Sequence, residues 1–378
     1  MPIKGDTRDK SCNKYSAKSF SKGLMDNIAA LFKRSCDNVS PDNKTFGKDK
    51  NNGNPQKHQL YRYLQIISLV IFIISACLFA NETIIQPYRS KKVVEKVQSL
   101  YPESSVISEE TIPAVTSHSN DDQSSDPALQ RDSEGRFIKF HNLLRVNTDV
   151  KGWIIVPDSE IDYPVLQSSA EDPEYYLERN IYREYDRQGS LFIDVKSSVE
   201  KNSKNIVIYG HNMKTGAMFH DIARYQDLNF YKERPIIYFD SLYQTGIWKI
   251  FAVIITNGST KNGDTFFDYT RTEFQDESDF LNFVHQLRVR SLYNFNVDIN
   301  ENDQLLTLST CSYELPDYRT VVVARKVRDG ENLDVDVDAS KNTPLYPQSW
   351  YKTYGGEPPK VLSFEEALEA GMISWYKP

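Results

Sequence analysis

Hydrophobic and polar positions divide the chain into stretches of different character. Residues 1–62 are mostly polar, and they precede an apolar run from Tyr63 to Ala80. A polar stretch follows over 81–135, and short apolar runs then alternate with turn residues over 136–330. This order predicts a polar tail, a membrane-spanning helix, a linker and one folded domain. The sequence assigns no role to the C-terminal extension, residues 331–378.

The apolar run matches the thickness of a lipid bilayer. It holds eighteen residues without a charge. At about 1.5 Å per residue it spans roughly 27 Å, close to the hydrocarbon core of about 30 Å. A buried core helix is the alternative, but the run has no polar stripe and long polar stretches flank it. We do not expect a cleaved signal peptide, because more than sixty residues precede the run and no clear cleavage site follows.

Charge predicts how the chain is oriented across the membrane. Residues 1–63 carry 13 Lys/Arg and 6 Asp/Glu, a net charge of +7, whereas the whole chain has a net charge of -7. Basic flanks stay in the cytoplasm, so the tail is expected inside the cell and the folded domain outside. A short amphipathic helix is expected at Gly23–Arg34. The overall negative charge argues against a nucleic-acid partner.

The linker is predicted from its composition. Residues 103–134 contain eight Ser and eight Asp/Glu, two prolines and no aromatic residue. Such a stretch buries too little apolar area to offset the entropy lost on ordering. We therefore expect it to hold the folded domain away from the membrane.

The folded domain has the pattern of a mostly β protein. Turn residues separate most of the short β-rich runs, and two helices are expected among them, one starting at Asp172-Pro173 and one amphipathic over Glu277–Ser291. Eight short strands with interspersed helices favour a closed or nearly closed barrel, or a sandwich. The expected strands are Trp153–Val156, Tyr163–Gln167, Leu191–Val195, Ile206–Tyr209, Pro235–Asp240, Trp248–Thr256, Gln304–Thr310 and Thr320–Val327.

The positions of the four cysteines single out one candidate reactive residue. Cys12 and Cys36 lie in the tail and Cys77 in the apolar run, so Cys311 is the only cysteine of the folded domain. A single thiol outside the cell cannot form an internal disulfide there, and it is a candidate reactive group. The alternative is a small core residue, which is what most such cysteines are. Strand alternation separates Cys311 from the apolar face: one face carries Leu305, Thr307, Ser309 and Cys311, and the other carries Leu306 and Leu308.

Two further residues complete a possible catalytic set. Arg319 begins the next strand, and a hairpin brings the start of that strand beside Cys311. His211 directly follows the strand NIVIYG, at a strand-to-loop junction where scaffolds often hold functional groups. A thiol nucleophile, an imidazole acid/base and a guanidinium are the parts that acyl transfer through a thioester requires. We find no metal-ligand spacing and no phosphate-binding loop, so no metal or cofactor is expected.

The motifs together resemble the sortases of Gram-positive bacteria, most closely their class B branch. The stretches that carry the resemblance are GWIIVPDSEIDYPVLQ (152–167), GSLFIDV (189–195), IVIYGHNMKTGAMF (206–219) and LLTLSTC (305–311), in the family's order. The helix expected before the Cys311 strand is similar to the insertion that marks class B. The resemblance covers about residues 136–328 and implies an eight-stranded sortase-like barrel with added helices, behind a single N-terminal anchor.

The resemblance implies roles and partners. Cys311 would be the nucleophile, His211 the acid/base and Arg319 the oxyanion or substrate-carbonyl partner, while Ser309, Thr310 and Leu166 would line the substrate groove. Surface proteins with a C-terminal sorting signal would be cleaved after Thr and joined to a cell-wall peptide amine. Other readings stay open: a pilin polymerase that uses a pilin lysine, a non-catalytic membrane-tethered peptide-binding module, and a hydrolytic cysteine peptidase.

Overall fold

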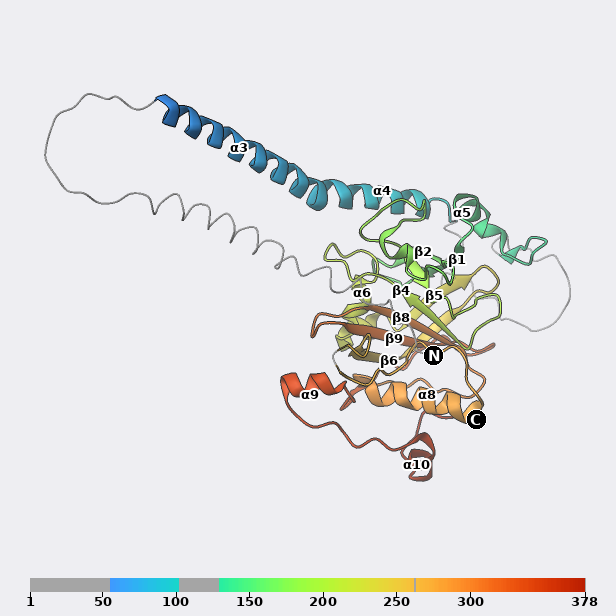
Figure 1. The fold of residues 1–378 in the computed structure, drawn as a ribbon. Coiled ribbons are helices and arrows are strands. Elements are labelled where there is room, and N and C mark those ends of the chain that lie inside the picture. Colours follow the sequence, from blue (N-terminus) through green and yellow to red (C-terminus); the bar gives the residue numbers. More distant parts are fainter. Residues whose placement is uncertain (1–54, 102–128, 262, 378) are drawn as a thin grey trace. The chain divides into compact units, whose positions relative to one another are not determined.

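A computed structural model describes residues 55–101, 129–261 and 263–377 (Figure 1). The expected helix Gly23–Arg34, the cysteines Cys12 and Cys36, and most of the expected linker lie outside these residues. The described residues fall into two compact units, one of which ends at Tyr88 while the other begins at Arg89. We describe each unit by itself.

The first unit contains the apolar run within helix α3, Pro55–Ala80. A π-helical turn, Asn81–Ile85, and the helix α4, Gln86–Gln98, come next along the chain. Side chains from Leu60 to Phe79 are exposed over the whole run, as expected for a helix that contacts lipid. Within the described part of the chain, this is the one helix that is long and apolar enough to cross a membrane.

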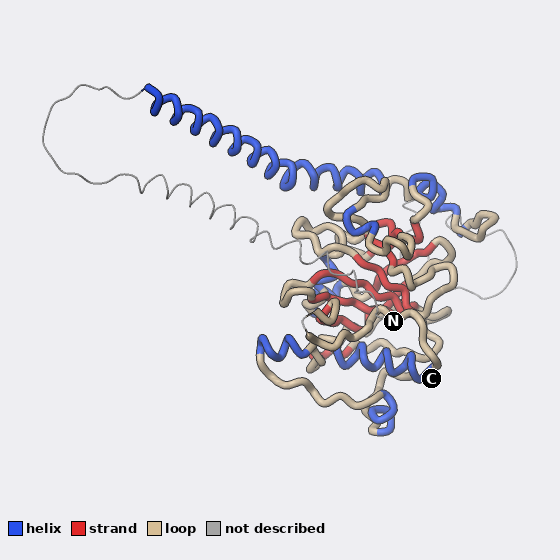
Figure 2. Tube along the Cα trace, viewed as in Figure 1, coloured by secondary structure: helices blue, strands red, loops and turns tan. Residues whose placement is uncertain are grey.

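The second unit is built on a closed barrel of eight strands (Figure 2). Their spatial order is β1-β2-β3-β4-β8-β9-β6-β5, and β5 pairs with β1 to close the barrel. Most neighbours are antiparallel, but β2–β3 and β4–β8 are parallel. The strands are β1 Val150–Ile155, β2 Asp162–Leu166, β3 Leu191–Ile193, β4 Asn205–Tyr209, β5 Ile236–Ser241, β6 Ile247–Asn257, β8 Leu305–Cys311 and β9 Tyr318–Lys326. The mostly β, eight-stranded fold is therefore confirmed, and all eight expected strands are present.

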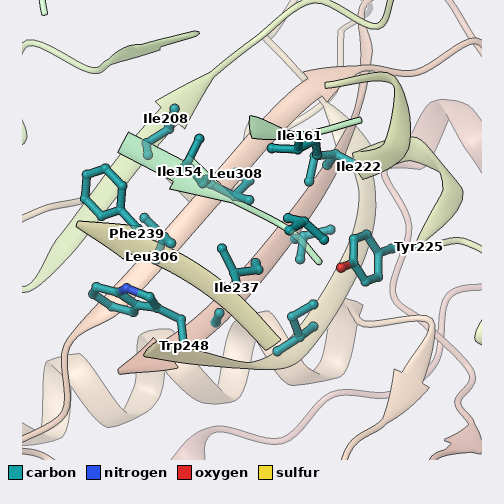
Figure 3. Packing of buried hydrophobic residues seen from close by; sticks show 14 of the residues in the cluster. Ile154, Ile161, Ile208, Ile222, Tyr225, Ile237, Phe239, Trp248, Leu306 and Leu308 are labelled. Carbon is teal, nitrogen blue, oxygen red and sulfur yellow. The ribbon is translucent and has the colours of Figure 1, made fainter. Parts of the chain in front are cut away.

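Strand alternation places one set of apolar side chains inside the barrel. Ile154, Ile208, Leu306 and Leu308 meet there with Ile237 and Trp248 (Figure 3). Each is at most 2% exposed. Because successive residues of a strand point to opposite faces, this packing turns Leu305 and Cys311 of β8 to the outside of the barrel.

Helix α8, Glu277–Arg290, covers the outer face of β6, β9 and β8 (Figure 1). Its apolar stripe, Phe280, Phe283, Val284 and Leu287, packs against Phe251, Ile254, Val321 and Val323. Asp276 begins the helix, since its side chain accepts the Asp279 backbone N–H at 2.8 Å. The expected helix over 277–291 is thus present almost at its predicted bounds.

Short elements join the strands. Two short helical elements follow the hairpin of residues 131–137. They are the 3-10 turn Ile138–Phe140 and the helix α5, His141–Val146. The helices α6 His220–Arg224 and α7 Leu228–Glu233 connect β4 to β5. The C-terminal extension contributes β10 Ser340–Lys341, which pairs with β7 Tyr293–Asn294, and the helices α9 Gln348–Tyr354 and α10 Phe364–Glu369.

Two expectations differ from the structure. The helix expected at Asp172-Pro173 is only a 3-10 turn, Tyr175–Glu178, because the chain becomes extended at Arg179, which forms a β-bridge with Tyr185. The segment 81–135, expected to be a linker, begins with helical residues, and the folded unit begins at Arg89 rather than 136. Val97 and Tyr101 are buried there, and the Tyr101 ring stacks on Trp153 with centroids 4.4 Å apart.

Candidate active site

Three neighbouring strands bring Cys311, His211 and Arg319 together. β8 lies between β4 and β9, and Cys311 is the register partner of Arg319. Directly opposed Cα atoms of an antiparallel pair are about 4.5–5.5 Å apart. On the other side, Tyr209 of β4 aligns with Ser309 of β8, so His211, two residues further on, comes level with Cys311. All three residues line one pocket of about 240 Å³.

Cys311 ends β8 and is partly exposed at the pocket, in contrast to the buried residues that precede it in the strand. Its backbone is fixed, because the side chain of Asn212 donates a hydrogen bond to the Cys311 carbonyl at 2.9 Å. The Asn212 side-chain oxygen lies 3.1 Å from Nδ1 of His220 in α6. Asn212 therefore links the end of β8 to the loop that carries His211. Sequence analysis did not assign Asn212 a role, although it directly follows His211.

His211 is 9% exposed, and Nε2 of its ring lies 2.8 Å from the Leu177 carbonyl. A carbonyl only accepts hydrogen bonds, so Nε2 carries the proton of the neutral ring and Nδ1 is the basic nitrogen. Burial lowers the pKa of His211 below its usual value, and the Leu177 carbonyl opposes this shift. The positive charge of Arg319 lowers the pKa further. A neutral imidazole at neutral pH can accept a proton from a thiol.

The backbone before His211 passes through a tight space. A Cβ atom on Gly210 would lie 2.4 Å from Leu191 Cδ2 and 2.8 Å from the ring of Phe219. Any side chain at position 210 would therefore displace the Leu191 and Phe219 side chains from their packing. The glycine lets the strand end close enough to the core to hold the imidazole at the pocket.

Arg319 is held by its own loop. Nη1 of Arg319 lies 3.3 Å from the Asp317 carboxylate and donates to the Tyr318 carbonyl at 3.1 Å. The second Asp317 oxygen accepts the Ser259 hydroxyl at 2.5 Å. A Cβ atom on Gly258 would lie 2.9 Å from the Arg319 guanidinium carbon, so the 258–259 backbone packs directly on this side chain. Asp317 was not among the predicted site residues, and its only signal in the sequence is a carboxylate two positions before the arginine.

Two of the three residues predicted to line the substrate groove lie at the pocket. Ser309 and Thr310 line the pocket, although both are buried, at 1% and 2% exposure. Ser309 contacts the Tyr269 hydroxyl at 3.0 Å, and the Thr310 hydroxyl donates to the Gly210 carbonyl at 2.9 Å. Tyr269 also lines the pocket, and sequence analysis did not single it out.

Leu166 does not line this pocket, and its assignment to the groove needs correction. It is fully buried in a separate cluster with Val150, Trp153 and Phe192, which α4 and α5 cover. The reason is strand alternation in β2, since residue 166 lies between β1 and β3 with its side chain on the outer, covered face.

Comparisons with known proteins show the family of this chain. The Sortase domain family profile matches residues 154–327. Sortase B of Listeria monocytogenes is 39% identical over 176 residues, 47% of this chain and 68% of the relative. Sortase B of Staphylococcus aureus is 31% identical over 192 residues, 50% of this chain and 75% of the relative.

Solved structures of sortase B are also similar to this chain. Sortase B from Bacillus anthracis in complex with AAEK1 has a TM-score of 0.51 and 29% identity, covering 65% of this chain and 99% of that one. The Staphylococcus aureus sortase B–substrate complex has a TM-score of 0.51 and 26% identity, with the same coverage. The barrel with its pocket is thus a sortase domain, the fold of cysteine transpeptidases. Within that class, the chain belongs to the class B sortases.

Proposed function

We propose that this protein is a membrane-anchored transpeptidase in which Cys311 is the nucleophile. It cleaves a C-terminal sorting signal after Thr and joins the protein to an amine of a cell-wall peptide. The observation that carries the proposal is the convergence of Cys311, His211 and Arg319 on one pocket from three adjacent strands. The membership of the chain in the class B sortases supports it.

In the first half-reaction, His211 accepts the thiol proton and the Cys311 sulfur attacks the carbonyl carbon of the scissile Thr residue. A C–S bond forms, and negative charge develops on the carbonyl oxygen. The Arg319 guanidinium stabilises this charge, since a fixed cation in a partly water-excluded pocket interacts strongly with an oxyanion. The C–N bond then breaks, and the His211 imidazolium donates its proton to the departing amine.

In the second half-reaction, an acceptor amine attacks the thioester and loses a proton to His211. The new C–N bond forms as the C–S bond breaks, and Cys311 regains its proton. Ser259, Asp317 and Gly258 keep the guanidinium in position during both halves. Ser309 and Thr310 border the substrate, and their hydroxyls serve mainly to fix Tyr269 and the end of β4.

The anchor and its charges support the proposed location. Helix α3 is long and apolar enough to cross the membrane once, and the residues before it are basic. The tail then lies in the cytoplasm and the barrel outside, where sorting-signal proteins and peptidoglycan precursors are available. One helix is a sufficient anchor, because its insertion is effectively irreversible.

The test is mass spectrometry of the full-length protein in detergent, incubated with sorting-signal peptides and defined amines. A thioester on Cys311, followed by a peptide joined to a cell-wall stem peptide, is the expected result. If the sorting peptide is joined only to a pilin-lysine peptide, the pilin lysine replaces the cell-wall amine as the acceptor in this proposal. If the sorting peptide is only cleaved and released as a free acid, the protein is a peptidase. Joining that persists in Cys311→Ala would end the assignment of Cys311.

A further inference from the structure

The C-terminal extension approaches the candidate site from outside the barrel. After β10 it contacts the end of α8 (Figure 1), where the Asn342 side chain donates to the Arg288 and Ser291 carbonyls at 3.2 and 2.9 Å. The Leu345 backbone N–H then donates to the Val289 carbonyl at 2.8 Å. These bonds fix the point from which α9 starts, at Gln348.

Helix α9 binds the loop that follows β6. The backbone N–H of Ser349 donates to the Asp264 carboxylate at 2.9 Å, and the Ser349 hydroxyl donates to the other Asp264 oxygen. Asp264 is only 3% exposed. Its loop, described over residues 258–261 and 263–268, begins with Gly258 and Ser259, which contact Arg319 and Asp317.

The same helix binds the segment between Cys311 and Arg319. The Tyr318 hydroxyl and Ser349 Oγ are 2.6 Å apart, and the Tyr318 and Trp350 rings are stacked with centroids 6.3 Å apart. Tyr318 is completely buried and immediately precedes Arg319. The Tyr354 hydroxyl donates to the Glu314 carbonyl at 2.8 Å. Ser349 therefore connects Asp264, in the loop that contacts Arg319, to Tyr318, the residue before Arg319.

The two loops are also joined to each other beneath Arg319. The Gly258 N–H donates to the Asp317 carbonyl at 2.7 Å, and Ser259 binds the Asp317 side chain. Asp317 in turn pairs with Arg319. Holding both loops thus restricts the guanidinium through its contacts with Gly258 and Asp317.

We propose that Ser349, Trp350 and Tyr354 of the extension, here named the α9 clamp, are positioning residues for Arg319. The clamp sets where the guanidinium lies relative to Cys311, and the extension is therefore part of the catalytic domain rather than an appendage. This inference rests on the proposed transpeptidase function. Misplacing a catalytic group by about 1 Å can cost up to about 100-fold in rate, so a clamp far from the chemistry has a measurable effect.

The experiment compares Ser349→Ala with Ser363→Ala in the full-length protein. Ser363 is the matched control, because its hydroxyl lies in the same extension and caps α10, which packs beneath α8. Ser349→Thr tests rescue, since threonine keeps the hydroxyl. Two readouts are taken: steady-state joining of a sorting peptide to an amine, and hydrogen exchange of the backbone over residues 258–264 and 312–319. Thermal unfolding of each variant reports its stability.

We expect Ser349→Ala to lower kcat about tenfold with little change in KM and to raise hydrogen exchange in both loops. Ser349→Thr restores both, and Ser363→Ala changes neither. An unchanged kcat in Ser349→Ala, or an equal loss in Ser349→Ala and Ser363→Ala, overturns the proposal. A wild-type protein that joins no peptide overturns the proposed function instead, and the exchange comparison still decides whether the clamp holds the two loops.

Discussion

At the scale of single residues, the site combines one partly exposed cysteine with two restrained partners. Cys311 is the partly exposed member, whereas His211 and Arg319 are each 9% exposed. The restraint comes from neighbours that sequence analysis did not assign, chiefly Leu177, Asn212 and Asp317. Such supporting groups keep reacting groups oriented before substrate arrives.

Replacing the sulfur tests the nucleophile. Cys311→Ala is expected to abolish thioester formation and joining while leaving the thermal midpoint nearly unchanged, because the side chain is partly exposed and the substitution is small. Cys77→Ala is the matched control, since Cys77 is exposed on α3 and is expected to leave activity intact. Loss of joining in both variants would point to a general effect of the substitutions.

The buried imidazole predicts the pH profile. Burial lowers the pKa of His211, so the acid limb of kcat/KM is expected below pH 6.5, the usual value for histidine. Activity is lost as the pH falls through the lowered pKa, because the protonated ring cannot accept the thiol proton. Steady-state kinetics from pH 4.5 to 8 measure the limb.

A second histidine provides the control for that profile. His285 also has its pKa lowered by burial, but its ring binds the Leu362 carbonyl beside α8, and His285 does not line the pocket. His285→Gln is expected to leave the acid limb in place. An acid limb above pH 6.5 in the wild type would contradict the assignment of His211.

At the scale of elements, the local pattern of apolar and polar residues correctly predicted the strands and α8. The β8 sequence LLTLSTC alternates between the barrel interior and the outer face, and Leu306 and Leu308 lie inside as the alternation requires. Local signals failed at Asp172-Pro173, where capping residues are followed by only one 3-10 turn. There the pairing of Arg179 with Tyr185 ends the turn, and helix propensity, which contributes only tenths of a kcal/mol per residue, is too weak to oppose it.

The N-cap of α8 allows an energetic test of one element. Asp276→Ala removes the acceptor of the Asp279 N–H and is expected to lower the free energy of unfolding by about 1 kcal/mol. Urea denaturation measures the change. Glu273→Ala, an exposed residue outside the helix, is the control and is expected to change stability little. A cost no larger than that of the control would show that the cap contributes nothing.

At the scale of the whole molecule, buried charges tie the extension to the barrel. Glu331 accepts hydrogen bonds from Arg325 at 2.5 and 2.8 Å and from Lys249 at 2.8 Å. Arg325 is fully buried and Lys249 is 5% exposed. Burial alone would raise the pKa of Glu331, but the hydrogen bonds from Arg325, from the Arg328 backbone N–H and from Lys249 outweigh it and lower the pKa to about 2.

This network predicts stability at acid pH. A carboxylate with a lowered pKa stabilises the fold fully above its ordinary pKa of 4.5, and the contribution is lost as the pH falls from 4.5 toward 2. Glu331→Gln is expected to cost about 3 kcal/mol at pH 7, because it leaves two buried cations without their carboxylate. Urea denaturation at pH 7 and pH 3 measures the difference, which shrinks at the lower pH.

Asp329→Asn is the control for the network. Asp329 is exposed and lies two residues before Glu331, so its replacement is expected to change stability little at either pH. If Asp329→Asn and Glu331→Gln had equal effects, the loss would reflect net charge rather than the buried network.

The sequence by itself determined the apolar run of membrane-spanning length, the eight strands, α8, and the three candidate residues that line the pocket. The elements follow from periodicity and from the length of an uncharged run, Arg319 from the hairpin that brings it beside Cys311, and His211 from its place after a strand and from the family resemblance. The tertiary structure decided that Leu166 is a core residue, that the helix after Arg89 packs on the barrel, and that the extension reaches Tyr318 and Asp264. Local patterns encode which face of an element is apolar, but which distant segment covers that face depends on long-range packing.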